Sequence, residues 1–260
     1  MPWTERQLAL LQAMGLRVWS TPSDNAPTAA VAAAGPAADE AIVPRRPAAP
    51  ADVPAPASAS APSCGDLPAL DWPALRDAVA VCRKCGLCES RTQTVFGTGH
   101  EQAHWMVVGE APGESEDREG EPFVGAAGQL LDRMLAALQL SRAADGPPER
   151  SVYIANTLKC RPPRNRNPGP DEMAQCEPYL VRQIELLKPR LILAMGRFAV
   201  QALLRTDEPI GRLRGRLHRY EGVPLVVTYH PAYLLRSPLD KAKAWEDLCL
   251  AAATVEGGGT

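Results

Sequence analysis

The sequence has few aromatic residues and few histidines. Aromatic residues make up 5% of its 260 residues, with three phenylalanines, and there are four histidines. It has no apolar run as long as a membrane span, which needs about 20 residues. It also lacks the basic-then-apolar start that is typical of a signal peptide. We therefore expect a cytoplasmic protein that does not bind membranes.

Neither sign of charge is in large excess. The chain has 28 Lys and Arg against 30 Asp and Glu, a net charge of -2, so net charge gives no indication of nucleic-acid binding. A local basic surface can still bind a polyanion. Two loops are rich in arginine: one carries Arg161, Arg164 and Arg166, and the other carries Arg212, Arg214, Arg216 and Arg219. A solvated charged surface is the alternative interpretation of both.

Composition divides the chain into three parts. Ala, Pro and Ser predominate in residues 21–71, which contain no aromatic residue. Such a segment cannot bury enough apolar surface to offset the entropy lost on ordering. We therefore predict an amphipathic segment at residues 1–20, a disordered Ala/Pro-rich linker at 21–71 and an ordered domain at 72–255.

Four short apolar runs predict buried parallel strands, with helical patterns between them. The strands are predicted at 105–108, 152–157, 191–195 and 224–228, and the helices at 125–140, 170–187, 197–204 and 239–253. This alternation favours an α/β fold, a three-layer α/β/α domain with a central four-stranded, mainly parallel sheet. Ligands of such folds bind beyond the carboxyl ends of the strands. The sequence places residues 109–113, Asn156 and His230 there.

The seven cysteines are an odd number, which argues against a complete set of disulfides. Cys82 and Cys85 form a Cys-x-x-Cys pair, and Cys160 and Cys176 follow the second predicted strand. Four thiolates can hold zinc or a cubane iron–sulfur cluster, and the spacing does not choose between them. Cys88 forms a second Cys-x-x-Cys with Cys85, so the first ligand pair also stays open. The alternative for Cys160 and Cys176 is that they are small buried apolar residues.

Five motifs lie in order along the predicted domain. They are Cys82-Arg-Lys-Cys85 and its continuation to Gly97, Gly109-Glu-Ala-Pro-Gly113-Glu-Ser-Glu-Asp117, Pro122-Phe-Val-Gly-Ala-Ala-Gly128, Asn156-Thr-Leu-Lys-Cys160-Arg-Pro-Pro and His230-Pro-Ala-Tyr-Leu-Leu-Arg236. Together they resemble the family 4 uracil-DNA glycosylases. The resemblance implies a base-excision-repair hydrolase that flips uracil out of DNA and cleaves its N-glycosidic bond. It also implies a [4Fe-4S] cluster on Cys82, Cys85, Cys160 and Cys176.

The resemblance further implies a uracil-binding set at the strand ends. The amide of Asn156 offers a donor and an acceptor to the O4 and N3–H edge of a flipped uracil. Phe123 would stack on the base, and His230 would stabilise the negative charge that develops on uracil O2. Glu110 and Ala111 lie in the loop whose backbone N–H groups can bind a uracil oxygen. The alternatives are a turn residue for Asn156 and a core ring for Phe123.

The motifs do not fix the residue that positions the attacking water. Another family of uracil glycosylases has an aspartate at the position of Ala111. We keep Glu110, Glu116 and Asp117 as candidates, and predict His230, Glu110 and Glu116 as the catalytic set. Charge complementarity at a helix N-terminus is the alternative for Glu116 and Asp117.

We expect DNA contacts from residues on both sides of this site. Arg164, Arg214 and Arg236 are predicted to contact phosphates. Tyr233, Leu234 and Leu235 are predicted to fill the gap left by the flipped base. Two other functions stay open. One is a uracil-DNA-binding variant of the superfamily that is trapped covalently on DNA, although its Lys-Arg-Arg-Ile-His-like insertion is absent. The other is a non-enzymatic iron–sulfur redox protein, which would leave the base-binding residues without a use.

The segment at residues 1–20 has Leu8, Leu11 and Met14 on one side of a helical pattern, followed by Trp19. It resembles the opening peptide of the psi subunit of the bacterial replicative polymerase. An amphipathic segment on a long linker can dock in a groove of a partner. We expect it to bind a replication or repair protein, with folding back onto the domain as the alternative. The protein itself is expected to be a monomer.

Overall fold

The protein is described by a computed structural model over residues 67–257. The predicted amphipathic segment and most of the predicted linker lie outside the described residues, as do residues 258–260. The predictions made for residues 1–66 therefore stay predictions. The predicted linker ends too late, because Leu67–Ala69 form a 3₁₀ turn with Leu67 buried in the core, and Asp71 caps the helix that follows.

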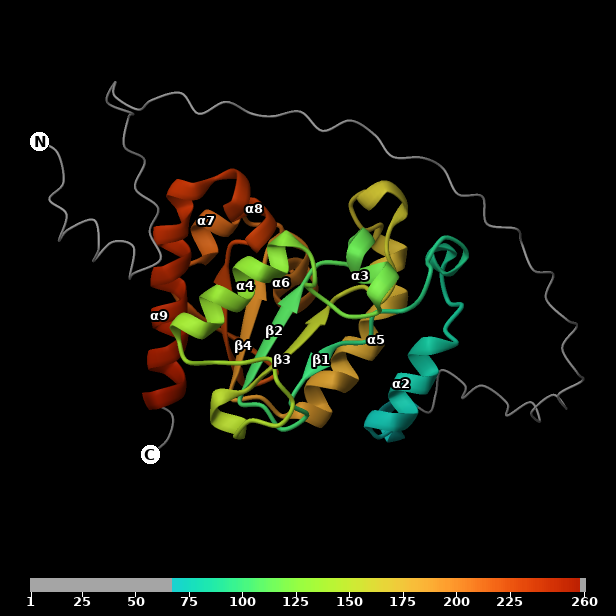
Figure 1. The fold of residues 1–260 in the computed structure, drawn as a ribbon, viewed down its shortest axis with the longest axis horizontal. Coiled ribbons are helices and arrows are strands. Elements are labelled where there is room, and N and C mark those ends of the chain that lie inside the picture. The colour runs from blue at the N-terminus through green and yellow to red at the C-terminus, as the bar shows by residue number, and fades with distance from the viewer. Residues whose placement is uncertain (1–66, 258–260) are drawn as a thin grey trace, which may run out of the picture. The chain divides into compact units, whose positions relative to one another are not determined.

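A central sheet organises the described domain, with its strands in the order β1-β3-β2-β4-β6-β5. Figure 1 labels the first four of these strands. Its four central strands run parallel to one another. They are β3 (Val152–Asn156), β2 (Trp105–Gly109), β4 (Leu191–Met195) and β6 (Val223–Thr228). The register pairs Gly109 with Asn156. The carboxyl ends of these strands therefore meet at one edge of the sheet.

The α/β prediction is confirmed, but the predicted strand number was too small. Within residues 67–257 the sheet has six strands. The two additional strands, β1 (Thr98–Gly99) and β5 (Leu217–Tyr220), pair antiparallel at the edges. β1 is two residues long, and β5 alternates exposed and partly buried residues within the second arginine-rich stretch. Neither has the apolar run that identifies a buried strand.

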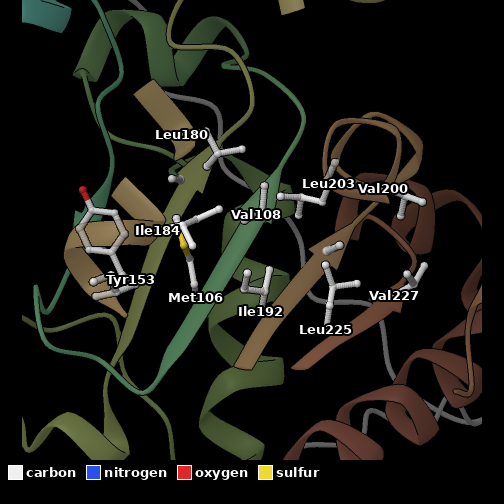
Figure 2. Close-up of a cluster of buried hydrophobic side chains, with 14 of the residues drawn as sticks. Met106, Val108, Tyr153, Leu180, Ile184, Ile192, Val200, Leu203, Leu225 and Val227 are labelled. Atoms are coloured by element: carbon white, nitrogen blue, oxygen red, sulfur yellow. The ribbon is translucent and has the colours of Figure 1, made fainter. Parts of the chain in front are cut away.

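Helices cover both faces of the sheet, as a three-layer fold requires. α5 (Pro170–Leu187) and α6 (Arg197–Leu204) pack on one face, and α4 (Ala126–Ala137) and α9 (Lys241–Gly257) on the other. Side chains alternate between the faces along each strand. Met106, for example, lies in the core under α5 and α6 that Figure 2 shows, whereas its neighbour Val107 lies in the opposite core.

Shorter elements complete the domain. The remaining α-helices are α2 (Trp72–Ala80), α3 (Glu114–Glu119), α7 (Ile210–Leu213) and α8 (Pro231–Arg236). Single 3₁₀ turns span Leu67–Ala69, Gly86–Glu89, Pro148–Arg150, Pro163–Asn165 and Pro238–Asp240. None of the helices in the described region combines the length and the apolar character needed to cross a membrane.

Candidate active site and cysteine site

A pocket of about 190 Å³ opens beyond the carboxyl ends of β2, β3 and β6. It brings together all five residues that were predicted to bind uracil: Glu110, Ala111, Phe123, Asn156 and His230. Two larger hollows of about 530 and 590 Å³ also occur in the described domain, but none of these five residues lines them. The residue chemistry therefore favours the smaller pocket as the active site.

Asn156 is the last residue of β3 and is 3% exposed. Its side-chain oxygen Oδ1 is buried and has no hydrogen-bond partner within the described residues. Gly109 lies opposite, and a Cβ atom there would be 2.4 Å from this oxygen and 2.7 Å from the ring of Phe123. Leaving such an acceptor unpaired costs about 1–3 kcal/mol. A ligand with an N–H donor would therefore be bound at this point.

Phe123 occupies a strained position in the loop before α4. It has φ 56°, in the left-handed region that bulky residues rarely adopt. A Cβ at Gly128 would lie 1.7 Å from the Phe123 carbonyl oxygen, so the loop packs directly on the first turn of α4. The ring is 5% exposed and stacks on the imidazole of His230. Strain of this kind occurs often at ligand-binding sites, where surrounding contacts hold it.

His230 is the residue before α8 and acts as its N-terminal cap. Its Nδ1 accepts a hydrogen bond from the backbone N–H of Ala232 at 3.2 Å. The neutral ring must therefore carry its proton on Nε2. Burial, assisted by the charge of Arg236, lowers the pKa of His230 to about 4. Near neutral pH this residue is an uncharged N–H donor.

The three carboxylates of this region have different surroundings. Glu116 accepts backbone hydrogen bonds from Gly113, Val124 and Gly125 at 3.0, 3.1 and 3.2 Å. The two carboxylate oxygens of Asp117, which is buried, share the single backbone N–H of Thr92. The geometry thus favours the helix-terminus interpretation for Glu116, which also connects α3 to the Phe123 loop. Asp117 instead fixes the backbone at Thr92.

Glu110 differs from these two carboxylates. Within the described residues its side chain has no recorded hydrogen bond or ion pair, and burial raises the pKa of its carboxyl group. Both Glu110 and Glu116 line the pocket, whereas Asp117 does not. Of the three candidates, Glu110 has the carboxylate best placed to act on a water molecule.

Sequence reasoning missed Asn165, which also lines the pocket. It follows Arg164 in the loop between Cys160 and Cys176, and both residues have positive φ, 55° and 54°. Its Oδ1 accepts a bond from Nε of Arg161 at 2.8 Å. The available signal was an asparagine between arginines in a proline-rich loop, since asparagine adopts the left-handed conformation more readily than most residues.

Two of the predicted DNA-contact residues are engaged inside the protein. Arg214 bonds the carboxylate of Asp247 through Nε and Nη2 at 3.0 Å, and it also pairs with Glu246. Its guanidinium is therefore occupied within the fold. Leu234 is 1% exposed, so the prediction that it fills the gap in DNA is corrected. The helical phase of α8 turns Leu234 inward.

Other predicted contact residues remain accessible. Tyr233 and Leu235 on α8 are 37% and 44% exposed. Arg164 and Arg236 are also exposed, on the loop beside the pocket and on the last turn of α8. Of the two leucines predicted to fill the gap in DNA, Leu235 is therefore the one that is exposed.

The predicted cysteine ligands come together in a second, narrow pocket. Cys82, Cys85, Cys160 and Cys176 all line it, but so does Cys88, which leaves the first ligand pair ambiguous. Among the residues that the structure describes, no three His, Cys, Asp or Glu side chains form a ready metal-binding group. The structure thus brings the thiols together without arranging them around one point.

Two of these sulfur atoms accept hydrogen bonds. Nη1 of Arg91 lies 3.0 Å from Sγ of Cys160, and the backbone N–H of Lys159 lies 3.2 Å from Sγ of Cys176. Burial raises the pKa of both thiols, for Cys176 to about 12. The raised pKa values favour the protonated thiols. Bound metal would reverse this and favour the thiolates, because a coordinating thiol is deprotonated. Donors directed at the sulfurs fit a thiolate site better than two inert apolar residues.

Comparison with known proteins agrees with this geometry. Residues 96–250 match the uracil DNA glycosylase superfamily. A type-4 uracil-DNA glycosylase of Archaeoglobus fulgidus is 46% identical over 165 residues, which cover 60% of this chain and 79% of that protein. The type-4 enzyme of Pyrobaculum aerophilum is 42% identical over 189 residues, covering 70% and 93%. That of Saccharolobus solfataricus is 43% identical over 173 residues, covering 63% and 77%. The chain therefore belongs to the uracil-DNA glycosylase superfamily, and within it to the type-4 uracil-DNA glycosylases.

Proposed function

We propose that the protein is a DNA-repair hydrolase that removes uracil from DNA and leaves an abasic site. The observation that carries this proposal is the unpaired, buried Oδ1 of Asn156 in a pocket shared with Phe123 and His230. These three groups match the needs of a flipped uracil: an edge to pair with, a face to stack on and a donor for its developing charge. Membership of the family supports the same activity.

Recognition would depend on the direction of the Asn156 amide. Uracil N3–H would donate to Oδ1, and the amide NH₂ would donate to uracil O4. Cytosine has an acceptor at N3 and an amino donor at C4, so both partners would be reversed. The stacked ring of Phe123 would add roughly 1–3 kcal/mol without distinguishing between bases.

Bond cleavage would place the electron pair of the glycosidic bond on the uracil. His230, uncharged and protonated on Nε2, would donate a hydrogen bond to O2, where negative charge collects. The deoxyribose carbon becomes electron-deficient and accepts water. Glu110 is the proposed water-orienting base, because its carboxyl pKa is raised by burial toward the range that suits proton transfer. Asn165 is the second polar side chain available to that water.

The test of base recognition is Asn156→Ala in single-turnover excision from single-stranded and duplex DNA. Loss of a bidentate contact worth about 1–3 kcal/mol predicts a rate roughly 10- to 100-fold lower. Binding to undamaged DNA should persist, because phosphate contacts are unchanged. Unaltered excision would contradict the role of Asn156. A denaturing gel separates the main alternative, since a covalently trapped protein would migrate with the DNA and would release no more than one uracil per protein molecule.

We infer further that Cys82, Cys85, Cys160 and Cys176 hold a [4Fe-4S] cluster. Support comes from their shared pocket and from the N–H donors directed at two of the sulfurs. When bound, the cluster would supply a covalent connection between three separate chain segments. The reaction itself would be carried out by the pocket residues.

The partners proposed are uracil-containing DNA and a replication or repair protein bound by residues 1–20. The second proposal rests on the amphipathic pattern with Trp19 and on the length of the linker. A chain beginning at Leu67 keeps the buried 3₁₀ turn and the cap of α2, so it should keep full excision but lose capture of the purified replication or repair protein on an affinity column. Loss of excision on short oligonucleotides would instead make the segment part of the catalytic unit. A cytoplasmic location and a monomeric state complete the proposal.

A further inference from the structure

Lys159 is a buried cation between the uracil pocket and the cysteine site. It is 1% exposed, and its ammonium Nζ donates to the backbone oxygen of Asn156 at 2.8 Å and to Oε1 of Gln183 at 2.6 Å. Its backbone N–H donates to Sγ of Cys176. Burying an ammonium group is costly unless it is well hydrogen-bonded. A position that retains such a group inside the core requires an explanation.

Gln183, the second acceptor of the Lys159 ammonium group, has its side-chain amide fixed in one orientation. Its side chain is fully buried on α5, and its Nε2 donates to the backbone oxygen of Phe96 at 3.0 Å. Because a carbonyl can only accept, the NH₂ side of the amide must face Phe96. Oε1 is thereby directed toward Lys159, and the ammonium has a fixed second acceptor.

The chain between Asn156 and Lys159 is tied to the loop that forms the pocket. The backbone N–H groups of Thr157 and Leu158 donate to the carbonyls of Gly109 and Glu110 at 3.0 and 3.1 Å. Lys159 thus donates a hydrogen bond from the core to the backbone carbonyl of Asn156, the last residue of β3.

The side chain of Asn156 depends on this backbone position. Its Oδ1 has no hydrogen-bond partner among the described residues. Packing against Gly109, together with the position of the Asn156 peptide itself, therefore sets the direction of the amide. A displacement of about 1 Å in a reacting complex can cost 10²-fold in rate.

We propose that Lys159 is a positioning residue for uracil recognition, which fixes the peptide of Asn156 and so directs its amide at the base. This inference rests on the proposed role of Asn156 as the residue that pairs with uracil. It also gives the cysteine site a direct structural connection to the pocket, since one residue contacts both Cys176 and Asn156. Lys159 itself takes no part in the chemistry.

The test is a double-mutant cycle between Lys159→Met and Asn156→Ala, measured as single-turnover excision by the full chain. Methionine keeps the length of the side chain and removes the donor. Lys159→Met alone should slow excision roughly 10- to 100-fold. In the Asn156→Ala background it should cause no further loss, because there is no amide left to direct. Binding to undamaged DNA should remain unchanged in all four proteins.

Leu203→Ala provides the matched control. Leu203 is buried on α6 in the core of Figure 2, and no recorded hydrogen bond links its side chain to the Lys159 network. It should lower the melting temperature yet leave the excision rate unchanged in both backgrounds. If Lys159→Met does not fold, Gln183→Met removes the second acceptor and enters the same cycle.

Two outcomes would overturn the inference. One is an unchanged rate in Lys159→Met, and the other is an equal fold-loss in both backgrounds, which a general structural effect would produce. Failure of the proposed function is visible separately: Asn156→Ala would then excise uracil at the rate of the unaltered protein. The cycle therefore distinguishes a wrong role for Lys159 from a wrong role for Asn156.

Discussion

The rings of Phe123 and His230 are stacked, with centroids 5.4 Å apart and planes inclined by 27°. One ring belongs to a loop held in a left-handed conformation, and the other caps the helix that follows β6. Their contact joins the proposed stacking surface to the proposed donor for uracil O2. Each ring thus restrains the other before a base arrives, which reduces the ordering cost at the transition state.

The first prediction concerns the charge of His230. Its pKa of about 4 lies well below the ordinary value of 6.5, chiefly because of burial. An NMR titration of the ring should therefore show no protonation near pH 6.5, and His230→Ala should lower the excision rate by about 10²–10³. Because the unfolded chain binds this proton at higher pH than the folded one, stability relative to His230→Gln should fall as the pH drops from about 6.5 to 4. A ring that titrates near 6.5 would contradict the uncharged donor.

The second prediction separates two carboxylates of the pocket. Glu110→Gln should lower the excision rate with little change in melting temperature, because no recorded contact of the described residues depends on its charge. The excision rate of the unaltered protein should increase as the pH rises through the raised pKa of Glu110, because the ionised carboxylate is the active form. This increase with pH should be absent in Glu110→Gln. Glu116→Ala should instead destabilise the protein by about 1–3 kcal/mol, because three backbone donors lose their acceptor. A rate defect in Glu116→Gln without loss of stability would restore it as a catalytic candidate.

Much of the fold could be predicted because the central strands are apolar on both faces. Helices α5 and α6 coincide with their predicted limits, and the polar residues at the strand ends do share one pocket. The rest depends on contacts between distant residues. The carboxylate of Glu116 accepts hydrogen bonds from the backbone of Val124 and Gly125. Asp247, which binds the guanidinium of Arg214, lies 33 residues from it in the sequence. No local pattern in the sequence specifies such pairs.

The third prediction concerns the cysteines. Purified protein should be brown, absorb at about 400 nm and contain iron with little zinc. Cys160→Ser and Cys176→Ser should lose the iron and much of their solubility. Cys88→Ser is the sharper control, because Cys88 lines the same pocket, and Cys249→Ser, at an exposed position on α9, is the distant one. Both controls should keep the iron. Stoichiometric zinc in protein prepared without oxygen would contradict the cluster.

The fourth prediction compares two arginines that sequence reasoning assigned to the same task. Arg164 is exposed on the loop beside the pocket, whereas the side chain of Arg214 is 14% exposed and bonded to Asp247. Arg164→Ala should weaken binding to all DNA sequences and reduce the slope of log affinity against log salt by about 1. Its melting temperature should not change, because removal of an exposed charge costs little.

Arg214→Ala should behave in the opposite way. Asp247 is fully buried and also accepts bonds from Thr228 and from the backbone of Gly215. Removing the arginine would leave a buried carboxylate without its counter-charge, which typically costs about 3–5 kcal/mol. Thr228, which is bonded to Asp247, lies two residues before His230. Disturbing this bond should therefore displace His230 and also slow excision. Affinity measured against salt, together with thermal unfolding, checks both variants. The same two nitrogen atoms of Arg214 cannot bind the buried carboxylate and a DNA phosphate at once. An unchanged melting temperature in Arg214→Ala, together with a smaller slope of log affinity against log salt, would therefore show that the guanidinium leaves Asp247 to bind phosphate.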